Sequence, residues 1–251
     1  MRARRATIAA VLDSDPTPQS AIEPDPLHAS HPARPGPIAW IFWILFFVGT
    51  FLLDSAPYLT GKPPEPGMLD DPKMIGYSIV GIWLSFPIIV LLAWRSGLTR
   101  RDMGLVGLPA RRLLVWAAGI FAGLAITGFV PSLIWGEKLS VVEPITTAPQ
   151  GLAHWCLWIG LAVSAGIIEE LGMRGYGIGF LLRAGANRWG AAVGMALYFG
   201  MLHVYEGPAA VPVIAIWGFL FAYSYLKTGS LLPGMLAHSL VDAIAPLLVS
   251  K

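Results

Sequence analysis

The segment from Ala165 to Tyr176 places three ionisable side chains in one of the most apolar regions of the chain, namely Glu169, Glu170 and Arg174. A charge at the bilayer centre costs roughly 2.5–3.5 kcal/mol on insertion scales, so such residues usually have a function. On a helix, Glu170 and Arg174 share a face and can pair, whereas Glu169 points about 100° away. The spacing predicts one neutralised carboxylate and one that is available for chemistry. The alternative is a solvated ion pair at a helix end.

Three further polar residues stand in apolar runs downstream. His203 follows Phe199 by one turn, and His238 and Asp242 are four positions apart, so they share a helix face. Counted from the flanking arginines, Glu169 and His203 both lie roughly 20 Å deep and can meet on neighbouring helices. His238 is shallower by this count. Either its helix begins below the membrane interface or the site is a cleft spread along the helix axis.

Two chemistries fit these residues. In the first, Glu169, His203, His238 and Asp242 bind a divalent metal such as Zn²⁺, which keeps one position open for water. In the second, no metal is present and Glu169 is the general base on a water molecule. The histidines and Asp242 then hold the water or stabilise an oxyanion. Each histidine alone could equally be a satisfied core residue, and the residues leave the choice open.

The composition indicates a membrane protein. Of the 251 residues, 55% are hydrophobic and only 13% are charged, against about 25% charged in a typical soluble domain. We therefore expect an all-α, polytopic helical bundle of about seven to eight transmembrane helices in a lipid bilayer. A net charge of +2 and the lack of a basic cluster interleaved with aromatic residues give no indication of nucleic-acid binding. One cysteine excludes an intrachain disulfide.

Three regions are predicted along the chain: a disordered, proline-rich cytoplasmic tail (1–36), N-terminal transmembrane helices (37–149) and a catalytic helical core (150–251). A loop is expected from Asp54 to Lys73, and a basic segment at 95–112 is expected to lie at the interface through Leu98, Met103, Leu105 and Leu108. Glu206 is interpreted as solvated and Tyr176 as a packing residue. The expected spans are about 37–53, 75–94, 113–135, 152–182, 189–205, 209–226 and 231–249.

Lys and Arg residues concentrate in alternate loops, including the tail, the 95–112 segment and the turn with Arg183 and Arg188. By the positive-inside rule these segments face the cytoplasm. We therefore expect a multi-pass protein of the inner (plasma) membrane with a cytoplasmic N-terminus. An eighth span, formed if the 95–112 segment or the long fourth helix breaks differently, would change part of this topology.

The polar residues also fall into three ordered motifs. Glu169 to Arg174 reads EExxxR, Phe199 to His203 reads FxxxH, and His238 to Asp242 reads HxxxD. Their order and spacing over about residues 150–250 resemble the CPBP family, which contains CAAX proteases and bacteriocin-processing enzymes and is also called Abi.

The resemblance implies an intramembrane endopeptidase of metallo- or glutamate type. Glu169 would activate water, Glu170 and Arg174 would support it, and His203, His238 and Asp242 would bind water, a metal or the oxyanion. Asparagine is common in the family at position 242, so the aspartate there favours Zn²⁺ assistance. The implied substrate is a peptide or membrane-protein segment, lipidated or otherwise membrane-associated.

Two other function classes compete with the protease. A non-enzymatic membrane scaffold or bacteriocin-immunity-type protein would use the same cleft for binding, and the divergent N-terminal half favours it. A transporter would use Glu169 and the histidines as a proton relay, but the chain shows no inverted repeat of the kind such folds often contain.

Overall fold

The structure is a computed structural model, and it describes residues 34–61, 67–135, 149–207 and 210–249. These residues belong to one compact unit, His31–Lys251. The predicted disordered tail lies outside the described residues apart from 34–36. The loop predicted for 54–73 is described only in part.

The described residues contain helices and no strands, which confirms the all-α prediction. Each of the seven expected spans corresponds to helical structure, and the predicted limits are close except at the end of the first span, where the helix continues from 53 to Leu59. The described part of the 95–112 segment adds no further helix before α4 begins at Ala110. The elements are α2 (Pro37–Leu59), η1 (Met68–Asp70), α3 (Pro72–Arg95), α4 (Ala110–Trp135), α5 (Gly151–Glu170), η3 (Leu171–Ile178), α6 (Gly179–Arg183), α7 (Arg188–Leu202), η4 (His203–Glu206), α8 (Ala210–Thr228) and α9 (Leu232–Val249).

Five of these segments are long and apolar enough to cross a membrane. The longest is the continuous stretch Gly151–Arg183, which combines α5, η3 and α6. Only 11% of the most apolar window is buried in α2 and in α3, against 44% in α8. The exposed apolar faces of α2 and α3 are what a lipid environment requires. The chain is therefore a helical membrane bundle.

α7 has 15 residues and α9 has 18. Roughly 20 apolar residues are needed to cross the hydrocarbon core, so both helices are short for a span. α7 packs against α8, and α9 packs against α4 and α5.

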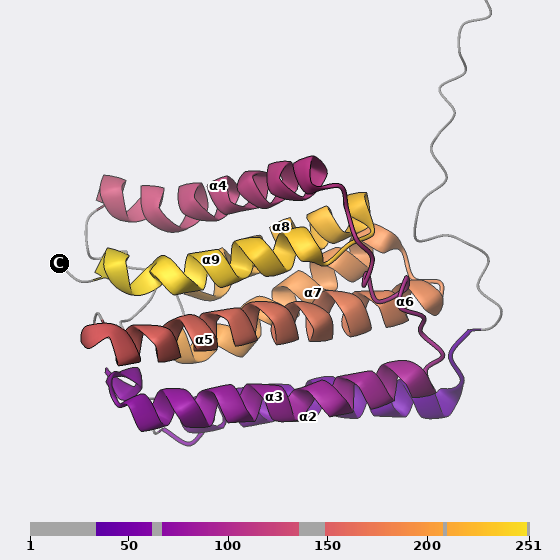
Figure 1. Cartoon of the computed structure of the whole chain (residues 1–251). Coiled ribbons are helices and arrows are strands. Elements are labelled where there is room, and N and C mark those ends of the chain that lie inside the picture. Colours follow the sequence, from indigo (N-terminus) through magenta and orange to yellow (C-terminus); the bar gives the residue numbers. More distant parts are fainter. Residues whose placement is uncertain (1–33, 62–66, 136–148, 208–209, 250–251) are drawn as a thin grey trace, which may run out of the picture. The chain divides into compact units, whose positions relative to one another are not determined.

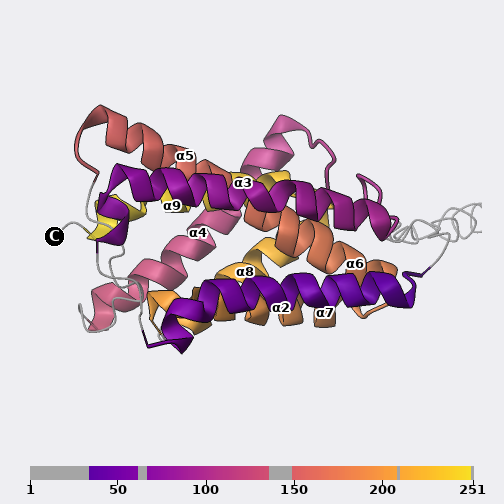
Figure 2. The ribbon, with the colours of Figure 1, turned by 90° about the horizontal axis from the view of Figure 1, so that it is seen from below.

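The helices run largely along one direction, with α4 on one side and α2 and α3 on the other (Figure 1). Seen after a quarter turn, α4 runs obliquely to α2 and α3 (Figure 2). α5 contacts both α3 and α9, and η3 continues from it into the region between α7 and α8. This arrangement brings the three predicted motifs, on α5–η3, α7 and α9, into the same part of the bundle.

Two glycines permit close helix contacts. A Cβ atom at Gly166 of α5 would collide with the Ser239 hydroxyl and would lie 2.7 Å from the Ser239 backbone nitrogen on α9. A Cβ at Gly200 of α7 would collide with the carbonyl oxygen of Val211 on α8. Small residues allow helix backbones to approach in membranes, where no hydrophobic force drives helices together. These contacts fix α9 and α8 relative to the helices that carry Glu169 and His203.

The connection between α3 and α4, residues 96–109, is tied to the turn between α8 and α9. The Tyr225 hydroxyl donates to the Asp102 carbonyl at 2.6 Å, the Ser230 hydroxyl donates to the Val106 carbonyl at 2.7 Å, and the Leu231 amide donates to the Gly104 carbonyl at 2.9 Å. α9 therefore begins against this connection, and the depth of His238 relative to the membrane interface stays a prediction.

One predicted interfacial side chain of this connection is placed differently. Met103 is buried, because the chain turns inward there and packs against the protein, whereas Leu105 is exposed. The Arg183 guanidinium lies 3.8 Å from the Asp102 carboxylate. The basic 95–112 segment and the Arg183–Arg188 turn thus meet at one end of the bundle, as the predicted topology requires.

Candidate functional site

The predicted ion pair between Glu170 and Arg174 is present and buried. The Arg174 Nη1 atom lies 2.8 Å from Glu170 Oε1, and both side chains are only 1% exposed. The prediction of an i, i+4 pair is confirmed, and the alternative of a solvated helix end is wrong. Glu170 ends α5, and Arg174 lies in the π-helix η3, whose widened turns often occur at functional sites.

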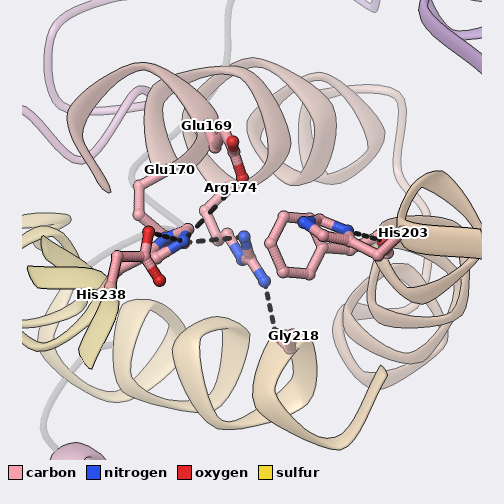
Figure 3. Close-up of polar contacts among 8 residues, drawn as sticks. Glu169, Glu170, Arg174, His203, Gly218 and His238 are labelled. Atoms are coloured by element: carbon pink, nitrogen blue, oxygen red, sulfur yellow. Dashed lines mark hydrogen bonds and ion pairs between the residues drawn. The ribbon is translucent and has the colours of Figure 1, made fainter. Parts of the chain in front are cut away.

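Arg174 is held on several sides. Its Nη2 atom donates to the carbonyl oxygen of Gly218 on α8 at 2.8 Å. Its guanidinium carbon lies 4.5 Å from the centre of the Phe199 ring and 5.1 Å from that of Phe221. A buried charge needs a partner and further hydrogen bonds to be tolerated. Arg174 has both, so it serves as the buried counter-charge of Glu170 (Figure 3).

His238 of α9 joins the other side of this pair. Its Nδ1 atom lies 3.2 Å from Glu170 Oε1, the oxygen that also binds Arg174. A carboxylate paired with arginine can only accept hydrogen bonds, so Nδ1 carries the proton and donates. The Nε2 atom faces Asp242 Oδ2 at 3.4 Å and Glu169 Oε2 at 3.8 Å. The predicted shared face of His238 and Asp242 is confirmed.

Glu169 differs from Glu170 in its surroundings. Its side chain is 30% exposed, and its Oε2 atom is buried without a hydrogen-bond partner. Adjacent carboxylates in one helix thus have different environments, because Glu170 is neutralised by Arg174 and Glu169 is not. A carboxylate with a free, buried oxygen beside a histidine can take a proton from water.

His203 lies at the C-terminal end of α7, where the helix narrows into η4. Its Nδ1 atom donates to the Phe199 carbonyl at 2.8 Å, since a carbonyl can only accept. This bond leaves Nε2 as the ring nitrogen that can meet another partner. We predicted that His203 and Glu169 meet, but among the described residues they form no ion pair. The link between them is indirect, because both side chains interact electrostatically with Asp54.

Two carboxylates near the site were not among the predicted site residues. Asp54 belongs to α2, which continues to Leu59, so its assignment to a loop is wrong. Four residues before it, the Thr50 hydroxyl bonds the Tyr198 hydroxyl of α7 at 2.6 Å. Asp54 is on the same face of α2 and interacts electrostatically with Glu169 and His203. In the sequence, the feature that could have indicated Asp54 as a site residue is its position as a charged residue at the end of an apolar run.

Glu206, in η4, was interpreted as solvated, and the structure corrects this. The residue is half-buried, and burial raises the pKa of its carboxyl, an effect that the nearby His203 and the Tyr205 hydroxyl partly offset. The chain turns back after His203 rather than leaving the bundle, which keeps Glu206 close to the site. Tyr176 is fully buried among aromatic rings, in agreement with the predicted packing role.

The predicted metal ligands do not form a compact donor set. No group of three or more His, Cys, Asp or Glu side chains in the described ranges is placed to hold a metal ion. His238 directs one ring nitrogen to Glu170 and the other to carboxylates, while His203 is bonded to its own helix. The arrangement of donors in the described residues therefore does not fit Zn²⁺.

Comparison with known proteins agrees with the resemblance noted in the sequence. Residues 151–244 match the family model of the "Type II CAAX prenyl endopeptidase Rce1-like" proteins. The chain matches no curated protein and no solved structure. The matched residues include all six predicted site residues, so over this part of its length the chain is similar to the Rce1-like type II CAAX prenyl endopeptidases.

Proposed function

We propose that this protein is an intramembrane endopeptidase in which Glu169 activates a water molecule. The observation that carries the proposal is the difference between two adjacent carboxylates. Glu170 is bound by Arg174, whereas Glu169 keeps a buried oxygen free beside His238. The family match supports endopeptidase chemistry.

In the first step, Glu169 takes a proton from water, and the water oxygen attacks the carbonyl carbon of the scissile peptide bond. The carbonyl π electrons move to oxygen and form a tetrahedral oxyanion. In the second step the C–N bond breaks, and the proton held by Glu169 passes to the leaving nitrogen. The products are a carboxylic acid and an amine, which become a carboxylate and an ammonium when the acid proton passes to the amine, and Glu169 is returned as a carboxylate; no other reactant is required.

The histidines are suited to the charge that develops. His238 has a proton on Nδ1, and its Nε2 faces the carboxylates of Asp242 and Glu169. The lone pair of an unprotonated Nε2 would repel the carboxylate oxygens, so a proton is needed on Nε2 or on one of the two carboxylates. With Nε2 protonated, His238 is a cation beside Glu169. It then donates to the oxyanion or to the attacking water. His203 Nε2, left free by the Nδ1 bond, accepts a hydrogen bond from water.

The substrate of this proposal is a peptide or membrane-protein segment at the membrane, lipidated or otherwise membrane-associated. The exposed sides of Glu169 and Asp242, 30% and 32% of their side chains, give a bound segment access to the buried cluster. The chain is a multi-pass protein of the inner (plasma) membrane in this proposal, with a cytoplasmic N-terminus. Zn²⁺ assistance stays a prediction from the sequence, which chelation tests.

The test compares protein termini in native membranes from wild-type and Glu169→Gln cells. New termini in wild-type membranes alone would identify both the activity and a substrate. The substitution keeps shape and removes the base, so cleavage should fall by about 10²–10⁴-fold. The matched control is Asp70→Asn, which removes a carboxylate from η1. Identical termini in wild type and Glu169→Gln, at equal protein levels, would favour the scaffold function.

A further inference from the structure

Phe221 of α8 lies directly against His238 and Arg174, which belong to the cluster formed with Glu169, Glu170 and Asp242, although Phe221 belongs to none of the three sequence motifs. It is 1% exposed, and its ring stacks on that of His238 with 4.9 Å between ring centres and 17° between planes. Phe199, which is in a motif, meets His238 edge-on at 6.0 Å and 88°. The parallel contact from α8 is the closer of the two.

The orientation of the His238 ring matters because its two nitrogens have different partners. The bond from Nδ1 to Glu170, at 3.2 Å, holds one edge of the ring. A single hydrogen bond still allows the ring to tilt about that edge, and tilting moves Nε2 away from Glu169 and Asp242. A flat ring stacked on the imidazole face opposes this tilt, because offset stacking depends on the planes remaining parallel.

Phe221 is itself fixed by the same cluster. One turn earlier on α8, the Gly218 carbonyl accepts a hydrogen bond from Arg174 at 2.8 Å, and the Arg174 guanidinium lies 5.1 Å from the Phe221 ring centre. On α9, a Cβ atom at Gly234 would lie 3.8 Å from Phe221 Cδ1, so the glycine leaves the ring in contact with the turn that leads to His238. Arg174 and α9 therefore set the position of Phe221.

We propose that Phe221 is a positioning residue that holds the His238 ring plane and thereby directs Nε2 toward Glu169. This inference rests on the proposed endopeptidase function for its kinetic consequence. It assigns α8 a part in the reaction, although α8 supplies no group that touches the reacting atoms. The competing explanation is that Phe221 is only a core side chain.

Phe180 provides the matched control for that explanation. It is another fully buried phenylalanine, and its ring contacts Trp40, Trp43 and Tyr176 rather than His238. Phe180→Leu and Phe221→Leu remove the same ring from equally buried sites. A purely structural effect would appear in both variants, whereas a positioning effect would appear only at Phe221.

The experiment uses the full-length protein in liposomes, with a quenched fluorescent peptide carrying a farnesylated CaaX end as the probe. Phe221→Leu should lower kcat about tenfold, as small misplacements do, and leave KM within about twofold. Phe221→Tyr, which keeps the ring, should restore most of kcat. In protein labelled with ¹⁵N-histidine, the His238 imidazole signals should shift in Phe221→Leu and not in Phe180→Leu. The chain has five histidines, and His238→Gln assigns the signal.

The inference is overturned if Phe221→Leu keeps wild-type kcat, if its His238 signals are unchanged, or if Phe180→Leu has the same effects. Phe221→Met replaces Phe221→Leu, with the same expected results, should the leucine variant not fold. Failure of the proposed function itself looks different. In that case wild type and Glu169→Gln would be equally inactive on native membranes and on the probe, and the imidazole signals alone would decide the role of Phe221.

Discussion

Replacing Arg174 with methionine should be among the most damaging single changes in this protein. The substitution keeps an unbranched apolar stem but leaves the Glu170 carboxylate, 1% exposed, without its counter-charge. Removing one partner of a buried ion pair costs about 3–5 kcal/mol in stability. The Gly218 carbonyl also loses the hydrogen bond that it accepts from Arg174 at 2.8 Å. We therefore expect the Arg174→Met free energy of unfolding to fall by about 4 kcal/mol.

The double substitution Glu170→Gln with Arg174→Met separates charge from packing. It removes both charges, and the glutamine amide oxygen can still accept the hydrogen bond from His238 Nδ1. The double variant should be more stable than Arg174→Met by about 1–3 kcal/mol, since no isolated buried charge remains. A less stable double variant would show that the pair is not what stabilises this region.

The assay follows unfolding in mixed micelles through the fluorescence of the ten tryptophans. Arg101→Met, at an exposed position, is the control and should change stability by less than about 0.5 kcal/mol. If Arg174→Met lies within about 1 kcal/mol of wild type, Glu170 is not a buried charge that depends on Arg174. The distinction drawn between Glu169 and Glu170 would then be refuted.

Two further predictions concern protons and metal. The pKa of the Glu206 carboxyl is raised in the folded protein, so the folded state binds this proton more tightly than the unfolded state does. The contribution of Glu206 to stability therefore falls as the pH rises from the unfolded pKa through the folded pKa. Unfolding measured at a series of pH values should show the Glu206→Gln variant gaining stability relative to wild type over that window, and a pH-independent difference would contradict the prediction. If water activation by Glu169 needs no metal, protein dialysed against EDTA should keep its activity on the farnesylated probe within about twofold, whereas a large loss restored by Zn²⁺ would establish the metal-assisted chemistry.

Much of the fold could be predicted because long runs of apolar residues indicate membrane-spanning helices. Each apolar run corresponds to helical structure, and the run before Arg183 was long enough to predict one extended element. The i, i+4 spacings of Glu170 with Arg174 and of His238 with Asp242 predicted real contacts. Local helical geometry alone is sufficient for such pairs.

The remaining features depend on tertiary contacts that sequence spacing does not contain. The π-helix around Arg174 has no sequence signature, and the last turns of α2 continue past Asp54 into a region that read as a loop. The starting point of α9 could not be counted from flanking arginines, because it depends on hydrogen bonds to residues 96–109. Phe221 could not be predicted as a site residue, because the sequence of an apolar helix does not show which side chain a phenylalanine will contact.

The attachment of residues 96–109 to the α8–α9 turn limits how modular this protein can be. The region that matches the endopeptidase family begins at residue 151, yet two hydrogen bonds to residues outside it hold the turn just before α9, and a third holds the end of α8. A shift of one residue along α9 would rotate His238 by about 100° and move it by about 1.5 Å. Grafting the matched region onto another transmembrane scaffold would therefore transfer the motifs without their register, unless the α3–α4 connection is transferred with them.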